Sequence, residues 1–517
     1  MNRRILLFQV FVIFVAFTIL GIMTAFASSF TTGPLVQVSG VSPFATCTAD
    51  NVDGQPGMNF LNSEVEPWVD VNPIDSNNIV GAWQQDRWSD GGARGLVAGV
   101  STDGGSSWQQ VVIPGISDCS DGIYDRSTDP WVTFGPKGDV YQLALSFNAI
   151  APPYEEGPGG DFDNALLASK STDGGFTWTQ PVEVIRDVDA NVFNDKQSIT
   201  ADPFDSDLVY AVWDRLVFPP AERANLIAGY YTAAYRGPAW FARTTDGGES
   251  WEPARSIFDP GQNNQTIGNQ IVVLPDGDLI NVFDLITIRR GAIATGAFYN
   301  VALIRSEDQG VTWGPQALNS KIKPIIVSPL RTIFVTDPET NEDVRTGDII
   351  PEIAVDPDNG NLYIVWQDAR FNGVDQIAFS MSTDGGFNWT APIKVNKTPT
   401  DIPLGNQQAF TPSVDVAADG TVAVTYYDFR NNTSDPATLP TDYFIVHCHA
   451  DCSDPANWSN EVRLTEVSFD MRQAPVARGF FTGDYEGLST ADNNFLAFFS
   501  QTHASDPGSI FFRRTGP

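Results

Sequence analysis

The chain has 517 residues, of which 42% are hydrophobic and only 18% are charged, and its formal net charge is −33. A surface this negative repels nucleic acid and anionic lipid, which argues against both as partners. The length exceeds what one ordinary core needs, and 44 Gly and 35 Pro favour many short strands and turns over long helices, so we looked first for an internal repeat.

The N-terminus carries an export pattern. Arg3 and Arg4 precede an apolar run over residues 5–26, which ends in Ala25-Phe26-Ala27. We therefore predict that residues 1–27 are a signal peptide and that the protein is secreted or displayed at the cell surface. The run is nearly long enough to cross a bilayer, so an uncleaved membrane anchor is the alternative, and this anchor is the only membrane contact we expect.

Four cysteines and three histidines limit the possible chemistry. In an exported chain the cysteines can form disulfides, and we predict the pairs Cys448–Cys452 and Cys47–Cys119 among the three possible connectivities. With so few His residues, a zinc site or a Ser-His-Asp triad is not expected.

Five segments share one pattern, with a Ser or Thr, an Asp, a glycine-containing pair and a Trp at fixed offsets. Their terminal Trp residues lie 62 to 76 positions apart. The segments are 101–108, 171–178, 244–251, 306–313 and 382–389. A sixth, degenerate copy ends at Trp458. Five copies at this spacing indicate a repeat architecture.

The pattern suits a tight turn between two strands. The glycines can take positive φ, and the Asp carboxylate can accept backbone N–H groups across the turn, while the hydroxyl and the Trp fasten the turn to its own sheet. These segments are similar to the Asp boxes, or bacterial neuraminidase repeats, of the sialidase superfamily, and the resemblance covers nearly the whole exported chain. It implies a β-propeller in which the Asp boxes are structural and lie on the face away from the active site.

Before each Asp box the chain repeats a strand, a turn and a second strand, as in 67–71, 72–78 and 79–83. Each repeat thus supplies four antiparallel strands of one blade, and a seventh repeat begins near 483–487. That last repeat lacks its fourth strand, which residues 34–40 could supply to close the ring. We therefore predict an all-β fold, with residues 28–517 as a single seven-bladed propeller. Known sialidases have six blades, and six is the alternative here.

Two further features concern loops and turns. Residues 150–163, 221–238 and 327–347 are predicted to be long inserted loops, where specificity would lie. The acidic turns at 202–207 and 356–360 could bind calcium, although ordinary hairpin turns explain them better because no spacing matches a full calcium loop. We predict no other cofactor.

Arginines recur where the second strand of a repeat ends, and four of them follow an Asp by one or two positions. The four are Arg87, Arg215, Arg370 and Arg430. They could grip a carboxylate or sugar at one mouth of the channel, or each could pair with its neighbouring Asp. Arg126 stands outside this pattern and is a further substrate-binding candidate.

The sialidase resemblance also implies catalytic residues. Asp86-Arg87 resembles the family's Asp-x-Arg segment, which places Asp90 as the acid/base, and Tyr485 stands roughly where a nucleophilic Tyr occurs, with Glu352 as its base. However, Val65-Glu66-Pro67 stands where the family has Arg-Ile-Pro, and a Glu there would repel the carboxylate of sialic acid.

Asp484, Glu486 and Glu66 offer a different reaction, in which two carboxylates act on a neutral glycoside as acid and base or nucleophile. Carboxylates also open other repeats, at Asp129 and Asp195. The sequence therefore favours a sialidase-like glycoside hydrolase that acts on glycans at the channel mouth opposite the Asp boxes. The alternative is a propeller that binds glycan or protein without catalysis.

Overall fold

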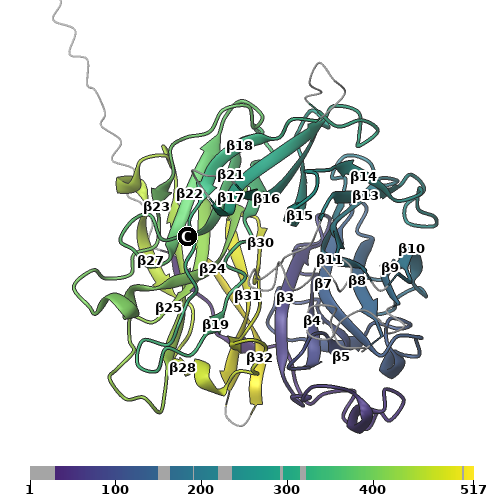
Figure 1. Cartoon of the computed structure of the whole chain (residues 1–517), viewed down its shortest axis with the longest axis horizontal. Helices are drawn as coiled ribbons and strands as arrows, with labels where there is room; N and C mark the ends of the chain where they lie inside the picture. The colour runs from purple at the N-terminus through teal and green to yellow at the C-terminus, as the bar shows by residue number, and fades with distance from the viewer. Residues whose placement is uncertain are drawn as a thin grey trace, which may run out of the picture.

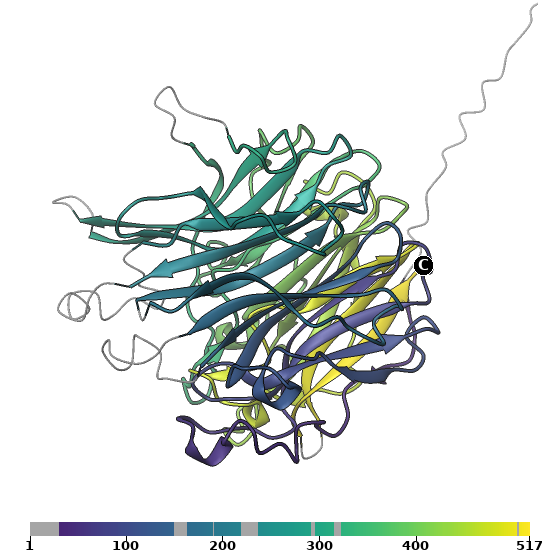
Figure 2. The ribbon, with the colours of Figure 1, turned by 90° about the vertical axis from the view of Figure 1, so that its right-hand side faces the viewer.

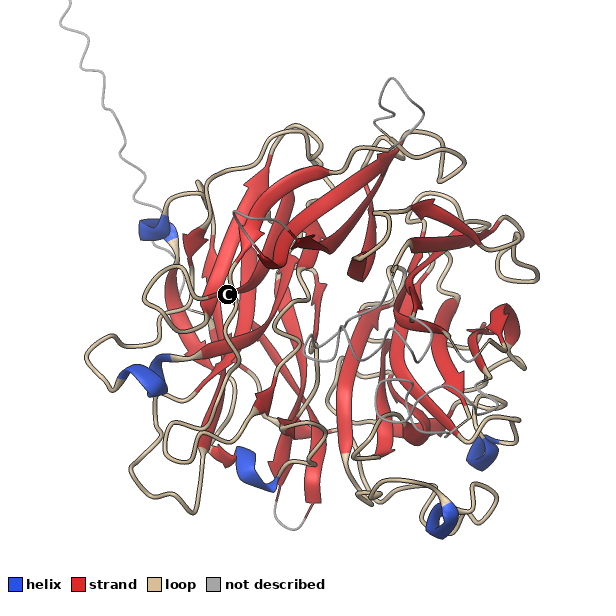
Figure 3. Cartoon of the chain, in the orientation of Figure 1, coloured by secondary structure: helices blue, strands red, loops and turns tan. Residues whose placement is uncertain are grey.

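The computed structural model describes residues 30–148, 163–189, 191–218, 236–290, 295–314, 322–503 and 506–517. The export segment at 1–27 lies outside these residues, as do 150–162 and 221–235 of the predicted loops. The described chain consists of antiparallel strands with a few one-turn 3₁₀ helices (Figure 3). Within these ranges no helix has both the length and the apolar character that a membrane crossing needs. The all-β, antiparallel part of the prediction is confirmed.

The strands fall into groups of four that pair in chain order. Ala93 of β5 also pairs with Ser127 of β7, which joins the first two groups into one sheet. Six groups are made of β3 (Glu64–Val71), β4 (Ile79–Arg87), β5 (Ala93–Ser101) and β6 (Gln109–Val112); β7 (Arg126–Phe134), β8 (Val140–Phe147), β9 (Asn164–Ser171) and β10 (Val182–Asp187); β11 (Val192–Ala201), β12 (Val209–Val217), β13 (Ala239–Thr244) and β14 (Arg255–Phe258); β15 (Asn264–Val273), β16 (Leu279–Arg290), β17 (Thr295–Ser306) and β18 (Ile325–Leu330); β20 (Glu352–Val355), β21 (Leu362–Asp368), β22 (Gln376–Ser382) and β23 (Ile393–Lys394); and β24 (Ala409–Val416), β25 (Val422–Asp428), β26 (Pro440–Cys448) and β27 (Ser459–Arg463).

The last group combines both ends of the chain. It contains β30 (Gly487–Ala491), β31 (Asn494–His503) and β32 (Asp506–Gly516), and β1 (Thr31–Thr32) and β2 (Val36–Gln37) pair with β32. The pairing predicted for residues 34–40 is thus present at β2. Figure 2 shows the purple N-terminal strands beside the yellow C-terminal ones, in agreement with the contacts of β3 with β31 and β32.

Smaller elements connect these groups. Strands β19 and β29 pair in parallel, and β28 pairs with β26. The elements are β19 (Val344–Arg345), β28 (Phe469–Asp470), β29 (Phe480–Phe481), η1 (Val52–Gly54), η2 (Asp118–Ser120), η3 (Leu404–Gln407), η4 (Pro455–Asn457) and η5 (Met471–Gln473).

The hydrophobic core lies between neighbouring groups. One cluster joins Val80 and Leu96 of the first group to Val132, Phe134 and Val140 of the second. Comparable clusters join later pairs of groups, so each sheet buries its two faces against the sheets before and after it. The first strands also contact one another in a cycle, in the order β3, β7, β11, β15, β20, β24, β30 and back to β3. Figure 1 labels all of these strands except β20.

The five repeated turns have the hydrogen bonds that the sequence predicts. In the first, Asp103 Oδ1 accepts the Ser107 N–H at 2.9 Å, Oδ2 accepts the Ser107 hydroxyl at 2.6 Å, and Ser101 Oγ accepts the Gly105 N–H at 2.9 Å. The same three bonds recur around Asp173, Asp246 and Asp308, and around Asp384 the Asn388 side-chain amide replaces the hydroxyl donor. Each repeated turn is therefore stabilised by hydrogen bonds within the turn itself.

Strand register puts these turns and the starts of the first strands at opposite ends of a sheet. Val71, at the end of β3, pairs with Ile79, which pairs with Ser101 at the first repeated turn. Glu64, at the start of β3, pairs with Gln85 near the end of β4. The starts of the first strands therefore lie at the end of the sheet opposite the repeated turns.

Both predicted disulfides are confirmed. Cys47 pairs with Cys119, and Cys448 pairs with Cys452 beside the degenerate sixth turn. In that turn the Trp458 indole N–H donates to the Cys452 carbonyl at 2.8 Å, so the short disulfide loop takes part in fixing the Trp.

Two glycines with positive φ, Gly105 in the first repeated turn and Gly277 in the turn between β15 and β16, provide a test of the packing between sheets. Gly105 has φ +92, and a Cβ there would lie 2.1 Å from the Phe512 ring of the last group, whereas Gly277 has φ +88 and a Cβ there would meet nothing within 4 Å. Gly277→Ala should cost about 1–2 kcal/mol for the backbone conformation alone. Gly105→Ala should cost roughly 1–3 kcal/mol more because of the steric clash. Thermal unfolding of both variants measures the difference, and equal losses would contradict the packing described.

Candidate functional site

The first strands of five groups carry a β-bulge at the same place. The pairing register shifts between Val65 and Trp68 in β3, and equivalent shifts occur in β7, β11, β15 and β24. Each bulge contains a residue with φ between 46° and 69°, namely Glu66, Asp129, Lys196, Gly268 and Thr411. Four of the five are not glycine. Because such a backbone is costly for an L-residue and bulges re-aim side chains, this rim is the first place to look for a site.

Lys196 lies at the centre of a charged cluster at this rim. Its Nζ is 3.0 Å from Glu66 Oε1, 2.8 Å from Asp484 Oδ2 and 3.5 Å from Asp129 Oδ1. The Arg345 Nε–H donates to Asp484 Oδ1 at 2.9 Å. One ammonium therefore joins carboxyl groups from β3, β7 and the segment before β30, while Arg345 of β19 supplies a second cation. We call these five residues the rim cluster.

The burial of these five side chains determines how costly an unpaired charge is at each of them. The side chains of Glu66, Asp129 and Asp484 are 1%, 5% and 5% exposed, whereas those of Lys196 and Arg345 are 11% and 18% exposed. The carboxyl groups thus lie beneath the two cations. In such surroundings an unpaired charge is costly, so the protonation of each acid depends on its partners.

The acids of the rim cluster are driven in opposite directions. Burial raises the pKa of Glu66 to about 8, with Asp129 and Asp484 adding to the effect and Lys196 opposing it. Burial alone would raise the pKa of Asp484, but Arg345 and Lys196 hold it well below its usual range. In the same way, Lys196 and a hydrogen bond from Glu66 outweigh burial and lower the pKa of Asp129. At neutral pH Glu66 is therefore protonated beside ionised Asp129 and Asp484.

Polar neighbours hold Glu66 in place. The Gln84 side-chain amide donates to Glu66 Oε2, and Arg87 Nη1 donates to Gln84 Oε1 at 2.5 Å. Burial, with Arg345 adding to it, lowers the pKa of Arg87 to about 10, and Glu66 opposes this shift. Of the predicted substrate-binding arginines, Arg87 therefore lies beside the rim cluster.

Tyr485 lies against the same cluster. The Lys196 Nζ is 5.5 Å from the centre of the Tyr485 ring, and the phenol donates to the Pro130 carbonyl at 3.3 Å. The ring is also packed against Trp68 and Trp131. Burial raises the pKa of Tyr485 well above its usual value, and the carboxylates of the cluster raise it further. The phenol is therefore neutral and points at a backbone carbonyl.

Asp90 and Arg126 form a separate pair. Arg126 Nη1 lies 2.8 Å from Asp90 Oδ1 and also donates to the Gly91 carbonyl, while Nε donates to the Gln55 side chain and Nη2 to the Pro56 carbonyl. The guanidinium also lies over the Trp88 ring, 4.2 Å from its centre. The structure thus joins these two predicted residues to each other.

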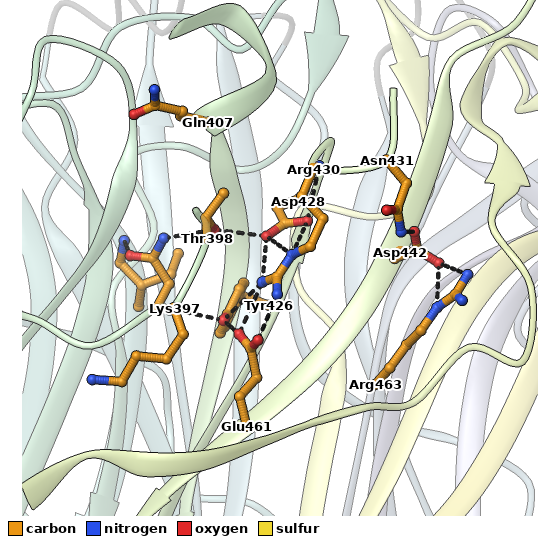
Figure 4. A network of polar contacts seen from close by, with 12 residues as sticks. Lys397, Thr398, Gln407, Tyr426, Asp428, Arg430, Asn431, Asp442, Glu461 and Arg463 are labelled. Atoms are coloured by element: carbon orange, nitrogen blue, oxygen red, sulfur yellow. Dashed lines mark hydrogen bonds and ion pairs between the residues drawn. The ribbon is translucent and has the colours of Figure 1, made fainter. Parts of the chain in front are cut away.

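The other predicted arginines each have carboxylate partners outside the rim cluster. Arg215 pairs with Asp187, and Arg370 pairs with Asp368 at 2.6 Å. Arg430 contacts Asp428 and Glu461 in a network between β25 and β27 (Figure 4). In the contacts of the described residues these three side chains hold neighbouring strands together.

Glu352 lies at the start of β20 and is 3% exposed. Its Oε2 accepts the Ser413 hydroxyl at 2.7 Å, and burial raises its pKa to about 8. Glu352 does not join the rim cluster but lines a cavity of about 220 Å³ that lies where the first strands β3, β7, β11, β15, β20, β24 and β30 meet, and we call this the central cavity.

Sequence reasoning noted Glu66, Asp129 and Asp484 but passed over Lys196 and Arg345. Lys196 stands at the residue equivalent to Glu66 and Asp129 in the third repeat, so comparing that one position across repeats would have found it. Arg345 falls within the predicted loop 327–347, where no local pattern marks it.

The two acidic turns that suggested calcium satisfy their own carboxylates. Asp202 Oδ1 accepts the N–H groups of Phe204 and Asp205 at 2.8 and 3.1 Å. Asp356 accepts the Asp358 N–H at 2.9 Å and the Asn359 amide. These contacts are those of ordinary acidic turns.

No protein-family model matches the chain, and no curated protein matches it. Among solved structures, the chain is similar to a protein of unknown function from Dyadobacter fermentans, with 16% identity, 75% of this chain and 94% of that chain covered, and a TM-score of 0.46. It is similar to the Hadza microbial sialidase Hz136, with 15% identity, 84% and 73% covered, and a TM-score of 0.44. It is also similar to the α-L-arabinanase of Penicillium chrysogenum complexed with arabinobiose, with 15% identity, 77% and 94% covered, and a TM-score of 0.44. Sialidases are thus among the structures that this chain resembles, and the reaction has to be argued from its own residues.

Replacing Lys196 tests the electrostatics of the rim cluster. Lys196→Met leaves Asp129 and Asp484 buried without their shared cation, so we expect a loss of about 3–5 kcal/mol in unfolding free energy. Lys170→Met is the control, because Lys170 and Asp139 form a 2.8 Å pair whose side chains are 18% and 32% exposed. That change should cost at most about 1 kcal/mol. Similar losses in denaturant unfolding would mean that Lys196 carries no special charge balance.

Proposed function

We propose that the chain is an exported, seven-bladed propeller and a glycoside hydrolase of sialidase-like fold, which acts on glycans at the rim opposite the repeated turns. The cyclic contacts of the seven first strands and the joining of β1 and β2 to the last group support seven blades in one closed domain. The predicted signal segment and the two disulfides support export.

The observation that carries the hydrolase proposal is that Glu66 and Asp484 contact the same Lys196 ammonium, while their surroundings raise the pKa of Glu66 and lower that of Asp484. Glycoside hydrolysis commonly needs one protonated and one ionised carboxyl group at the same bond. Both acids contact the same Nζ, at 3.0 and 2.8 Å, so their nearest oxygens lie no more than about 6 Å apart, which is compatible with the roughly 5–5.5 Å spacing of retaining enzymes.

In this proposal Glu66 donates a proton to the glycosidic oxygen as the bond to the sugar breaks. Asp484 is the carboxylate that attacks or stabilises the sugar carbon, and Glu66 then accepts the proton of the attacking water. Lys196 and Arg345 are the most exposed charges of the rim cluster, so they would meet the sugar hydroxyls first.

The surroundings of Tyr485 favour this two-carboxylate reaction over a tyrosine nucleophile. Its phenol is buried, neutral and hydrogen-bonded to the Pro130 carbonyl, all of which oppose ionisation. We take the substrate to be a neutral glycoside, because the two cations of the cluster are already paired with its two ionised acids and leave no excess positive charge for a sugar carboxylate.

The second candidate is a propeller that binds glycan without cleaving it. It is favoured by the ion pairs within the rim cluster, which satisfy Asp484 with two cations before any ligand arrives. Release of a fluorescent leaving group from a panel of neutral and anionic glycosides separates the two candidates. Hydrolysis of a neutral member supports the enzyme, whereas binding without release supports the alternative.

Three variants discriminate among the catalytic assignments. Glu66→Gln should slow hydrolysis of substrates with poor leaving groups by about 10²–10⁴-fold, and slow a strongly activated aryl glycoside much less, because the latter needs no proton donor. Asp90→Asn and Tyr485→Phe should retain activity if Glu66 and Asp484 carry the reaction. Loss of kcat in Tyr485→Phe with intact folding would instead support the tyrosine nucleophile, and loss in Asp90→Asn would restore Asp90 as the acid.

The pH profile gives an independent test of Glu66. A general acid works while it is protonated, and burial raises the pKa of Glu66 from 4.5 to about 8. We therefore expect kcat for a poor leaving group to persist through neutral pH and to fall as the pH rises through about 8. A fall near pH 4.5 would show that the acid has an ordinary environment and would contradict the assignment.

A further inference from the structure

Phe334 is a large apolar side chain near the rim, and it is 53% exposed. It lies in the segment between β18 and β20, which overlaps the loop predicted at 327–347 and also carries Arg345 of the rim cluster. Single exposed apolar residues are common on protein surfaces and by themselves indicate no function. The position of Phe334 relative to Arg345 therefore decides whether the ring has a role.

Backbone pairing places Phe334 directly opposite Arg345. Thr336 forms an antiparallel bridge with Asp343. Two residues further along each strand, the same register pairs residue 334 with residue 345, and we call residues 334–345 the rim hairpin. Residues directly opposite each other in an antiparallel pair have Cβ atoms roughly 4.5–5.5 Å apart. Phe334 therefore lies beside the residue whose guanidinium contacts Asp484.

The burial of the residues between them agrees with this register. Val335 and Val344 are both buried in one core cluster, and the Val344 N–H donates to the Val335 carbonyl at 2.9 Å. Successive side chains of a strand point to opposite faces. Phe334 and Arg345 therefore share the other face of the rim hairpin, which is turned away from that core.

Contacts on both sides hold the rim hairpin in place. The Thr336 N–H donates to Gln408 Oε1 at 3.0 Å, and the Gln408 amide donates to the Thr336 carbonyl at 2.7 Å. Arg472 forms an ion pair with the buried Asp337, and β19 pairs with β29 along the second strand. An exposed ring on a backbone that is already fixed binds a ligand without the cost of ordering a loop.

A polar side chain that suits sugar hydroxyls follows the rim hairpin. Gly347, with φ +56, packs so closely on Asp484 that a Cβ there would lie 2.0 Å from the Asp484 carbonyl oxygen. The next residue, Asp348, is half-buried, and its Oδ2 accepts the Thr332 hydroxyl at 3.1 Å. An apolar ring beside a few fixed polar groups is the usual composition of a small-ligand site.

We propose that Phe334 is the stacking platform of a second sugar subsite beside the rim cluster, so that the substrate is an oligosaccharide of at least two units. One unit lies against the rim cluster, and its neighbour places an apolar ring face on Phe334 while a hydroxyl donates to Asp348. An aromatic ring suits this role because it offers a large, flat apolar surface. The inference rests on the proposed function, since it extends the same binding site.

The first experiment compares two kinds of substrate in the full exported chain. One kind is a neutral disaccharide, from a panel of cellobiose, maltose, lactose and xylobiose. The other is the glycosyl fluoride of the same reacting sugar, whose leaving group is a single atom and does not reach Phe334. We expect Phe334→Ala to raise KM for the disaccharide roughly 5–30-fold, the usual effect of losing one aromatic contact, and to change KM for the fluoride less than about twofold.

Two further variants separate stacking from folding. Phe334→Trp keeps a flat ring and should keep KM for the disaccharide within about threefold of the wild-type value. Phe204→Ala is the matched control, because Phe204 is 59% exposed but lies in the turn between β11 and β12, at the end of the sheet that carries the third repeated turn. The control should leave both substrates unchanged. An unchanged disaccharide KM in Phe334→Ala, or an equal rise for the fluoride, overturns the proposal.

Binding measurements distinguish a failure of this inference from a failure of the hydrolase proposal. If the chain cleaves no substrate, the hydrolase proposal fails, and titration calorimetry with the same four disaccharides still tests the platform. Affinity should then fall roughly 5–30-fold in Phe334→Ala and stay unchanged in Phe204→Ala. Equal affinities in the wild type and both variants overturn the stacking role. So does the absence of both cleavage and binding for every disaccharide of the panel.

Discussion

The ammonium of Lys196 is the contact on which the rim of this fold depends. It joins carboxyl groups from β3, β7 and the segment before β30, which are far apart in the chain. Without a cation there, three acids would face one another in a space that is nearly closed to water, and their repulsion would oppose the approach of the first strands. With it, Asp129 and Asp484 stay ionised, whereas burial raises the pKa of Glu66 and favours its protonated form despite Lys196. The same charge balance that permits packing thus prepares an acid and a carboxylate side by side.

Local patterns in the sequence predicted the parts of the fold that depend on neighbours in the chain. The repeated turns, the short Cys448–Cys452 loop and the strand at 34–40 all follow from residue types at fixed spacing. In the same way, Arg370 and Arg430 contact the Asp that stands two residues before each of them. Arg215 shows the limit of this reasoning, because it pairs with Asp187 of β10, while the adjacent Asp214 bonds to Thr266 and Gly268.

The candidate site was only partly predictable, for a physical reason. Its carboxylates were visible because Glu66, Asp129 and Asp484 stand at repeat openings, but their roles depend on burial and on cations from other sheets. Lys196 reaches its partners through a bulge with positive φ, and Arg345 lies in a connecting segment. Neither feature leaves a local pattern in the sequence. The pKa differences that separate an acid from a carboxylate arise only once the sheets have come together.

On β3, Glu66 belongs to the rim cluster and Asp70 lines the central cavity, with Trp68 between them. One strand therefore has two different charge environments. The stacked rings of Trp68 and Trp131, with Tyr485 against them, follow the charged residues of the rim and precede the acids of the cavity. Rim acids therefore have Lys196 and Arg345, whereas cavity acids have only hydroxyls, backbone N–H groups and one another. Because water is scarce in both places, each set of acids needs positive charge or protons to remain stable. At the rim the protein supplies both, and the result is a proton donor beside a fixed carboxylate. In the cavity it supplies no cation, and burial raises the pKa of Glu352 to about 8 and that of Asp415 to about 7, so protons neutralise these acids instead.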